Sequence, residues 1–246
     1  MTTGDIAETY TCLICRDIGQ LHPRLPNGKV DYSRVIPCIC RSEAYRIERA
    51  AQLLQVCSLP FGTESKTFQT FRCGNQLQLI EAYNIALALA QETDGVRWVT
   101  LIAKVGRGKT HLALAVCHEW LRRGKPARYA FVPLLLKDLR DGFDRDDEGS
   151  YSKQLDFYCN VPLLVLDDLG VENPTKWAQE QLQTIVHYRG INGLPLMVTT
   201  NHGLDDLVGD AEHRIGSRLR RETWCRVIAI EAGEYHASSI PPRGSV

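Results

Sequence analysis

Residues 103–110 read Ala-Lys-Val-Gly-Arg-Gly-Lys-Thr and stand between an expected strand, 98–102, and an expected helix, 109–123. Glycines such as Gly106 and Gly108 let a loop turn its backbone N–H groups toward an anion, because glycine accepts unusual dihedral angles and presents no side chain. The helix that follows directs the positive end of its dipole at the same place. A strand, a glycine-rich loop and a helix in this order predict a polyphosphate-binding loop, or P-loop.

The side chains of this loop fit the same chemistry. Lys109 supplies a positive charge for the outer phosphates, and Thr110 offers a hydroxyl to Mg²⁺. The residues expected to bind the nucleotide are Val105, Gly106, Arg107, Gly108, Lys109, Thr110 and His111. Ala103 stands where the motif begins with glycine, and we expect this single methyl group to affect turnover more than nucleotide binding. A chance glycine-rich turn is the competing interpretation, which the flanking strand and helix disfavour.

Strands and helices are expected to alternate along most of the chain. The expected strands are 98–102, 127–132, 163–166, 196–199 and 224–230. The expected helices are 42–54, 76–90, 109–123, 134–143, 173–189 and 210–221, the fifth of them opening at Asn173-Pro174. This alternation predicts an α/β fold with a central parallel sheet flanked by helices. The continuous apolar run at 163–166 predicts a strand buried on both faces.

Two acidic residues, Asp167 and Asp168, directly follow this apolar run. Ligands bind at the carboxyl ends of strands in an α/β sheet, so the two acids are expected on the P-loop's side. In P-loop NTPases the first acid holds Mg²⁺ and the next orients or deprotonates the attacking water. An ordinary polar strand end is the alternative. Asn201, which ends the Val-Thr-Thr-Asn stretch 198–201, is expected beside Asp167, where its amide would fix the water and sense the outer phosphate.

The expected helix at 210–221 is rich in arginine. An arginine that one subunit presents to its neighbour's nucleotide can accelerate hydrolysis by orders of magnitude. Arg218 is the candidate for this role, and Arg214, four residues earlier on the same helical face, is the reserve. A solvated basic surface helix is the alternative, and we favour it for Arg220 and Arg221.

The nine cysteines form two groups. Two tight pairs lie within the first forty residues, Cys12 with Cys15 and Cys38 with Cys40. Such pairs supply the four soft ligands of a tetrahedral zinc site, and the metal would provide the folding energy that so small a module lacks. His22 could replace one ligand, and unligated thiols are the alternative. Core positions are expected for the remaining five, Cys57, Cys73, Cys117, Cys159 and Cys225.

The charge is balanced, with 29 basic and 29 acidic residues and a formal net charge of zero. No global field attracts nucleic acid or an anionic membrane, so a nucleic-acid contact must use a local patch. The basic groups expected to be available for it are Arg122, Arg123, Lys125, Arg128, Arg220 and Arg221. No apolar run approaches the length of a transmembrane helix and no signal peptide is evident, so we expect a cytoplasmic protein without a membrane partner.

Taken in order along the chain, the P-loop, Asp167-Asp168, the 198–201 stretch and Ser217-Arg218-Leu219 resemble the AAA+ ATPases of the DnaC/DnaI/IstB group. The similarity extends from a Thr-Phe-x-x-Phe segment at 67–71 to about residue 230. It implies an AAA+ P-loop NTPase core without a C-terminal lid at 67–235, preceded by a zinc-binding module at 1–45 and a helix and linker at 46–66, and followed by a flexible tail at 236–246.

The resemblance also implies roles for single residues. The catalytic set would be Lys109, Asp167, Asp168, Asn201 as sensor 1, and Arg218 acting in trans. Thr110 and Asp167 would hold magnesium, and the N-terminal cysteines would hold zinc. ATP, Mg²⁺ and Zn²⁺ are therefore the expected cofactors.

Members of this group are replicative helicase loaders and transposition helper ATPases. The resemblance implies an ATPase that is weak alone, is stimulated by assembly or DNA, and loads a hexameric replicative helicase onto single-stranded DNA. The helicase would dock on the zinc module, and ATP would drive homo-oligomer formation. One alternative is an IstB-like transposition helper. A second alternative is a P-loop small-molecule kinase, which would have a basic lid, whereas the loop 144–148 is acidic. A third is a zinc adaptor that binds nucleotide without hydrolysing it.

Overall fold

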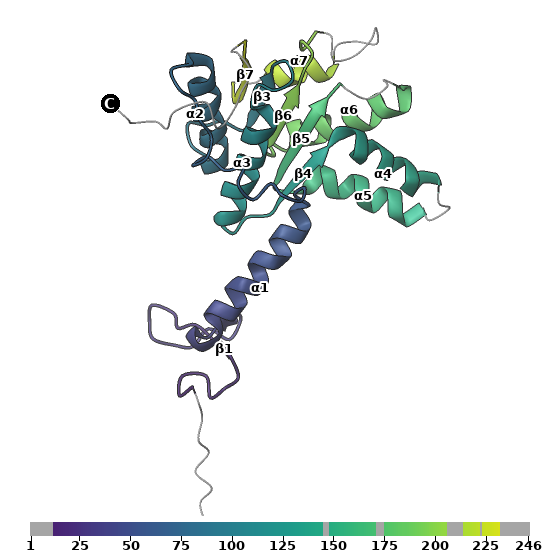
Figure 1. Ribbon diagram of the computed structural model, residues 1–246. Helices are drawn as coiled ribbons and strands as arrows, with labels where there is room; N and C mark the ends of the chain where they lie inside the picture. The colour runs from purple at the N-terminus through teal and green to yellow at the C-terminus, as the bar shows by residue number, and fades with distance from the viewer. Residues whose placement is uncertain (1–11, 145–147, 171–174, 206–213, 222, 232–246) are drawn as a thin grey trace, which may run out of the picture. The chain divides into compact units, whose positions relative to one another are not determined.

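The computed structural model describes residues 12–144, 148–170, 175–205, 214–221 and 223–231. They form two compact units, one within Met1–Gln52 and one within Leu53–Val246 (Figure 1). Helix α1 (Ile39–Cys57) contributes residues to both. None of the described helices combines the length and the apolar character that crossing a bilayer requires.

The larger unit is built on a five-stranded parallel sheet (Figure 1). Its strands are β3 (Trp98–Ile102), β4 (Ala127–Phe131), β5 (Leu163–Leu169), β6 (Leu196–Thr200) and β7 (Cys225–Ala229). They lie in the order β4-β5-β6-β3-β7, and every neighbouring pair is parallel. Parallel neighbours need crossover connections, which explains the alternation of strands and helices in the sequence.

Helices cover both faces of this sheet. On one face, α2 (Leu77–Gln91) and α3 (Lys109–Arg122) share a hydrophobic cluster with the strands. The other cluster contains side chains from α4 (Val132–Asp144), α5 (Glu148–Asn160), α6 (Lys176–Ile191) and α7 (Arg214–Arg221). Along β5, Val165 belongs to the first cluster and Leu164 and Leu166 to the second, as the alternation of side chains in a strand requires. The expected burial of β5 on both faces is confirmed.

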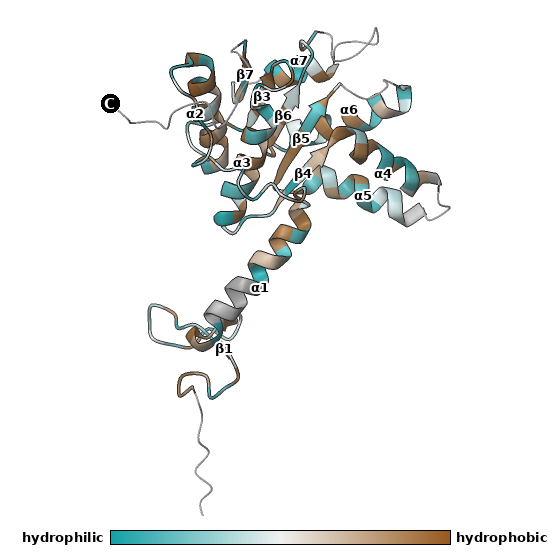
Figure 2. Ribbon diagram, viewed as in Figure 1, coloured by the Kyte–Doolittle hydropathy of each residue, from teal (hydrophilic) through white to brown (hydrophobic). Residues whose placement is uncertain are grey.

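The five strands and the helices expected from the sequence agree with the structure to within a few residues. The sequence did not predict α5, which occupies 148–160. Its side chains Tyr158 and Cys159 pack into the second cluster, which stabilises the helix. Its partner α4 carries hydrophobic and hydrophilic residues side by side along its length (Figure 2). Both helices lie between β4 and β5 in the chain.

Three elements, β5, α6 and α1, have the boundaries that differ most from expectation. β5 continues to Leu169, so Asp167 and Asp168 lie within the strand. The start expected for α6 at Asn173-Pro174 is wrong, because the helix begins at Lys176 and the Thr175 hydroxyl caps it by accepting the Ala178 N–H at 3.2 Å. α1 is longer than expected at both ends. Residues 171–174, most of the acidic loop 144–148, and the expected tail at 236–246 lie outside the described ranges.

The smaller unit contains a short antiparallel ladder, in which β1 (Gln20–Leu21) pairs with β2 (Ile36–Pro37). The chain between them turns at Gly28, whose φ of 81° is left-handed and whose N–H donates to the Leu25 carbonyl at 2.8 Å. Two-residue strands bury little apolar surface, so this unit needs a further source of stability.

Candidate functional site

The glycine-rich loop joins the end of β3 to the start of α3, as the sequence predicts. Gly106 and Gly108 have left-handed φ values of 75° and 85°, which a side chain would strain. Ala103 does not share this conformation, and its N–H donates to the Thr200 carbonyl at 3.1 Å, within the sheet. The departure from the motif at Ala103 therefore falls where the backbone does not need glycine.

The Lys109 amine is held by three acceptors. Its Nζ donates to the carbonyl oxygens of Ala103 at 2.7 Å and Lys104 at 3.1 Å, and to Asn201 Oδ1 at 2.7 Å. The side chain is buried, and this burial lowers the pKa of Lys109, an effect that the carboxylates of Asp168 and Asp167 oppose. The structure thus brings the predicted lysine and the predicted sensor asparagine into direct contact.

Asp167 is 2% exposed and accepts hydrogen bonds on both oxygens. Its Oδ1 accepts from Thr199 Oγ1 at 2.5 Å and lies 3.4 Å from Thr110 Oγ1, while Oδ2 accepts from the Tyr129 hydroxyl at 2.6 Å. The two residues expected to hold magnesium, Thr110 and Asp167, therefore lie side by side. An oxygen pair of this kind is suited to Mg²⁺.

Asp168 lies in an irregular part of β5, where the register with β6 shifts between Leu166 and Leu169. Its φ is 57°, which is uncommon for a residue with a side chain, and its N–H donates to Thr199 Oγ1 at 3.0 Å. Thr200 Oγ1 donates to the Leu169 carbonyl at 2.8 Å. Burial raises the pKa of Asp168, and the neighbouring Asp167 carboxylate raises it further. The irregularity lets two successive residues of one strand reach the same site: the buried Asp167 lies beside Thr110, and the partly exposed Asp168 lines the cavity at the loop.

A cavity of about 320 Å³ opens above the loop. It is lined by all seven loop residues expected to bind nucleotide, 105–111, together with Asp168 and Asn201. Lys66 and Leu114 also line it, and the sequence did not single them out. Asp167 does not line the cavity itself and is reached through Thr110.

The Thr-Phe-x-x-Phe segment packs against the first turn of α3. His111 Nε2 lies 3.1 Å from the Thr67 carbonyl and 3.3 Å from Thr70 Oγ1, and the Phe71 ring meets the imidazole edge to face at 5.1 Å between centroids. Phe68 and Phe71 are buried in the first hydrophobic cluster. This segment therefore supports the helix that begins at the nucleotide loop.

Arg218 does not line this cavity. It is half-buried on α7, and its guanidinium contacts Nδ1 of His187 on α6. The side chain of the reserve candidate, Arg214, lies outside the described part of the chain. The sequence predicts a role for Arg218 in a neighbouring subunit, and that role stays a prediction.

Most of the basic residues expected to be available for nucleic acid have contacts within the chain. Arg122 forms an ion pair with Glu119 at 2.7 Å, and Arg220 pairs with Asp205. Arg123 lies 3.4 Å from Glu92, which also binds Lys125. Arg128 stacks on the rings of Phe157 and Tyr158. Four of these basic side chains, Arg122, Arg123, Lys125 and Arg220, thus have an acidic partner, and a contact between this group and nucleic acid stays a prediction. The side chain of Arg221 is outside the described residues.

The four N-terminal cysteines converge, with all four sulfur atoms within 4.8 Å of one another. Cys12 and Cys38 are 3.8 Å apart at Sγ, and Cys15 and Cys40 are 3.4 Å apart. A tetrahedral zinc ion with Zn–S bonds of about 2.3 Å separates its sulfurs by about 3.8 Å, so the donor set fits zinc.

Backbone groups support this cluster. The Gly19 N–H donates to Cys15 Sγ at 3.2 Å, and the Gly19 carbonyl accepts the Cys38 N–H at 2.9 Å, which links the two halves. Hydrogen bonds from the Cys15 and Ile14 backbone lower the pKa of Cys12 to about 7.

His22 is not part of the cluster; its Nδ1 lies 2.8 Å from the Arg34 carbonyl. The expected core positions are confirmed for four of the remaining cysteines, and Cys225 is half-buried.

The sequence matches the family described as IstB-like ATP binding protein over residues 29–212, which include the loop and both acids. The chain belongs to this family. DnaC, the replicative helicase loader of Escherichia coli, is 30% identical over 157 residues, which are 63% of this chain and 62% of DnaC. A putative ATP-binding protein of a Mycobacterium tuberculosis insertion sequence is 29% identical over 183 residues, 74% of this chain and 71% of that protein. The match thus spans less than two thirds of the DnaC relative's length.

The fold of this chain is also found in solved structures. A crystal structure of the DnaC helicase loader superimposes with a TM-score of 0.60 and 21% identity, covering 70% of this chain and 100% of that one. The AAA+ P-loop fold expected from the sequence is therefore confirmed, as is the resemblance to the DnaC/DnaI/IstB group.

Sequence reasoning missed three residues that shape the site, Tyr129, Thr199 and Thr200. The two threonines precede Asn201 in the quoted stretch, and adjacent hydroxyls at the end of a buried strand were a usable signal. Tyr129 carries no such signal in the sequence, because tyrosine is common in apolar strands and only the structure shows what its hydroxyl binds.

Proposed function

We propose that this chain is a Mg²⁺-dependent ATPase that loads a replicative helicase onto single-stranded DNA. The observation that carries the proposal is a pair of contacts made by residues that line one cavity, Lys109 with Asn201 and Thr110 with the buried Asp167 behind it. Membership of the IstB-like ATP binding protein family supports ATP as the nucleotide. The name of the DnaC relative, replicative helicase loader, supports the biological role.

The proposed chemistry assigns one task to each residue. The backbone N–H groups of 105–110 bind the phosphates, and Lys109 leaves its carbonyl acceptors to bind the outer phosphates. Thr110 and Asp167 hold Mg²⁺, which neutralises phosphate charge when it is bound. Asp168 accepts a proton from the attacking water, and Asn201 orients that water.

The cysteine cluster is proposed to hold one structural zinc ion. Four sulfur donors fit its ligand preference, and a metal would supply the stability that the two-residue strands do not. Its proposed role is to keep the smaller unit folded as a protein-docking module.

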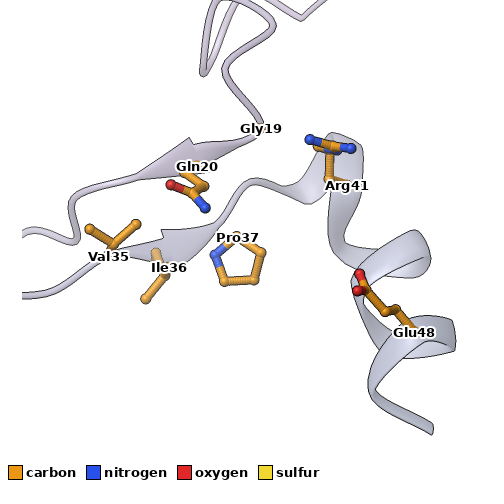
Figure 3. A pocket seen from close by; sticks show the side chains of 7 residues that line it. All are labelled: Gly19, Gln20, Val35, Ile36, Pro37, Arg41 and Glu48. Carbon is orange, nitrogen blue, oxygen red and sulfur yellow. The ribbon is translucent and has the colours of Figure 1, made fainter. Parts of the chain in front are cut away.

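A groove on the smaller unit supports the docking role. Its cavity of about 440 Å³ is lined by Val35, Ile36 and Pro37 on one side and by Arg41 and Glu48 of α1 on another (Figure 3). Val35 is 56% exposed and the nearby Ile39 72% exposed, so apolar surface is available to a partner. We propose that the replicative helicase binds here.

We further propose that ATP assembles the chain into a homo-oligomer in which Arg218 of one subunit reaches the nucleotide of the next. Because Arg218 does not line its own chain's cavity, the isolated subunit would hydrolyse ATP weakly. Mixing two inactive variants tests this: Lys109→Ala chains still offer Arg218, and Arg218→Ala chains still bind ATP. The mixture is expected to recover activity, and Arg220→Ala serves as the surface-arginine control. A mixture as inactive as its components would contradict action in trans.

The ATPase itself is tested by steady-state hydrolysis with and without single-stranded DNA and a candidate helicase. Asp168→Asn is expected to keep ATP binding and to lower hydrolysis by about 100-fold. Asp156→Asn, an exposed carboxylate on α5, is the control and should behave as wild type. No change in size or activity with DNA or helicase would overturn the loader proposal.

A transposition helper is the second candidate, and the insertion-sequence relative favours it. Identification of proteins that co-purify with the full chain separates the two. Recovery of a transposase without any helicase would replace the first proposal by the second.

A further inference from the structure

Asp167 accepts a hydrogen bond from a hydroxyl group on each of the two neighbouring strands. Tyr129 of β4 donates to Oδ2 at 2.6 Å, and Thr199 of β6 donates to Oδ1 at 2.5 Å. β5, which carries Asp167, lies between β4 and β6 in the sheet. The carboxylate is therefore held from the strands on either side.

These bonds determine the orientation of the carboxylate as well as its burial. A buried carboxylate is costly unless hydrogen bonds satisfy its oxygens, and here each oxygen has an O–H donor. Two donors on two oxygens also oppose rotation of the group. In this fixed orientation Oδ1 faces the Thr110 hydroxyl, 3.4 Å away.

The two hydroxyl donors, Thr199 and Tyr129, differ in their other contacts. Thr199 Oγ1 also accepts the Asp168 N–H at 3.0 Å, at the point where Asp168 adopts its left-handed φ. Thr199 therefore couples the two acids, whereas the Tyr129 hydroxyl contacts the first of them. The Tyr129 ring packs in the first hydrophobic cluster.

We propose that Tyr129 and Thr199 are positioning residues that set the Mg²⁺ affinity of the nucleotide site through Asp167. The proposal rests on the proposed function, in which Thr110 and Asp167 hold the ion. Neither residue lines the cavity, so each acts through the acid that it holds. Loss of a hydrogen-bonding partner of a metal ligand typically weakens metal affinity 10- to 100-fold.

Tyr129→Phe is a clean test because it keeps the buried ring and removes the O–H donor. The Tyr129 hydroxyl donates to Asp167 Oδ2 at 2.6 Å, so the substitution removes one hydrogen bond from the acid. Binding of a fluorescent ATP analogue to the full chain is measured as MgCl₂ is titrated, and again in EDTA. The variant is expected to need about 10-fold more Mg²⁺ for half-maximal enhancement of nucleotide binding. Its nucleotide binding in EDTA should equal that of the wild type.

Thr199 provides a second, independent variant pair. Thr199→Ser keeps the hydroxyl, so its Mg²⁺ midpoint should equal that of the wild type. Thr199→Val should raise the Mg²⁺ midpoint and also lower ATP hydrolysis, because Asp168 loses the hydrogen bond from its N–H. Tyr158→Phe removes another buried tyrosine hydroxyl, one that binds Arg128, and is the matched control. Thermal unfolding verifies that each variant is folded.

The outcomes separate the inference from the proposed function. If wild-type binding depends on Mg²⁺ and the midpoints of Tyr129→Phe and Thr199→Val are unchanged or lowered, the inference is overturned and the function stands. An equal shift for Thr199→Ser and Thr199→Val would also overturn it, because the hydroxyl would not matter. Wild-type binding that is the same in Mg²⁺ and EDTA would overturn both.

Discussion

Nζ of Lys109 lies 2.7 Å from Oδ1 of Asn201, although 92 positions separate the two residues in the chain. The contact joins the nucleotide loop, which follows β3, to the residue that follows β6, and these two strands are hydrogen-bonded neighbours. It places an amide oxygen at the lysine that is proposed to bind the outer phosphates. Asn201 is therefore poised to respond to what the lysine binds.

Asn201→Ala is expected to lower ATP hydrolysis by about 100-fold and to leave ATP affinity nearly unchanged. Lys109 keeps its two carbonyl acceptors, and its amine is freer to bind phosphate once the amide is gone. Single-turnover hydrolysis and equilibrium binding separate the two effects. Asn192→Ala, an exposed asparagine at the end of α6, is the control. A loss of affinity as large as the loss of rate would contradict the assignment.

Ala103→Gly is expected to change turnover by less than about twofold and to lower stability by about 0.5–1 kcal/mol. Ala103 is 6% exposed, has no left-handed φ, and donates its N–H into the sheet, so glycine gains nothing there. Gly108→Ala, with φ at 85°, should instead weaken nucleotide binding about 10-fold or more. A large rise in turnover for Ala103→Gly would show that the methyl group does obstruct the reaction.

Arg189→Met is expected to lower the free energy of unfolding by about 3 kcal/mol. The Arg189 guanidinium is fully buried and donates to the carbonyl oxygens of Tyr158, Cys159, Pro162 and Pro195, which would be left unsatisfied. Denaturant unfolding measures the change. Arg97→Met removes an exposed arginine that makes one bond to Gly193 and should cost well under about 1 kcal/mol. Equal losses would mean that the buried hydrogen bonds contribute little.

Purified protein is expected to contain one zinc ion per chain, and Cys38→Ser should lose it. Chelation should unfold the smaller unit and abolish helicase binding, but ATP binding should persist because the nucleotide cavity lies wholly in the larger unit. Cys225→Ser, outside the cluster, should retain the metal. Elemental analysis and circular dichroism report the two effects. A metal-free protein with a fully folded smaller unit would exclude the zinc proposal.

The sequence by itself predicted the P-loop, the alternation of strands and helices, and the pairing of Asp167 and Asp168 with that loop. These features depend on local chemistry: glycines at left-handed positions, an apolar run of strand length, and acids that follow it. The proximity of Cys12 to Cys15 and of Cys38 to Cys40 was predictable for the same reason, since close spacing lets both thiols of a pair reach one point.

Tertiary structure decided what depends on neighbouring strands. The order β4-β5-β6 places Tyr129 and Thr199 on Asp167, and no local pattern encodes which strand lies beside which. Packing against α4 and α6 stabilises α5 as a helix, although its own sequence gives little sign of one. Glu92, Glu119 and Asp205 form ion pairs with arginines and a lysine that the sequence offered to nucleic acid, because the fold decides which acid lies beside which base.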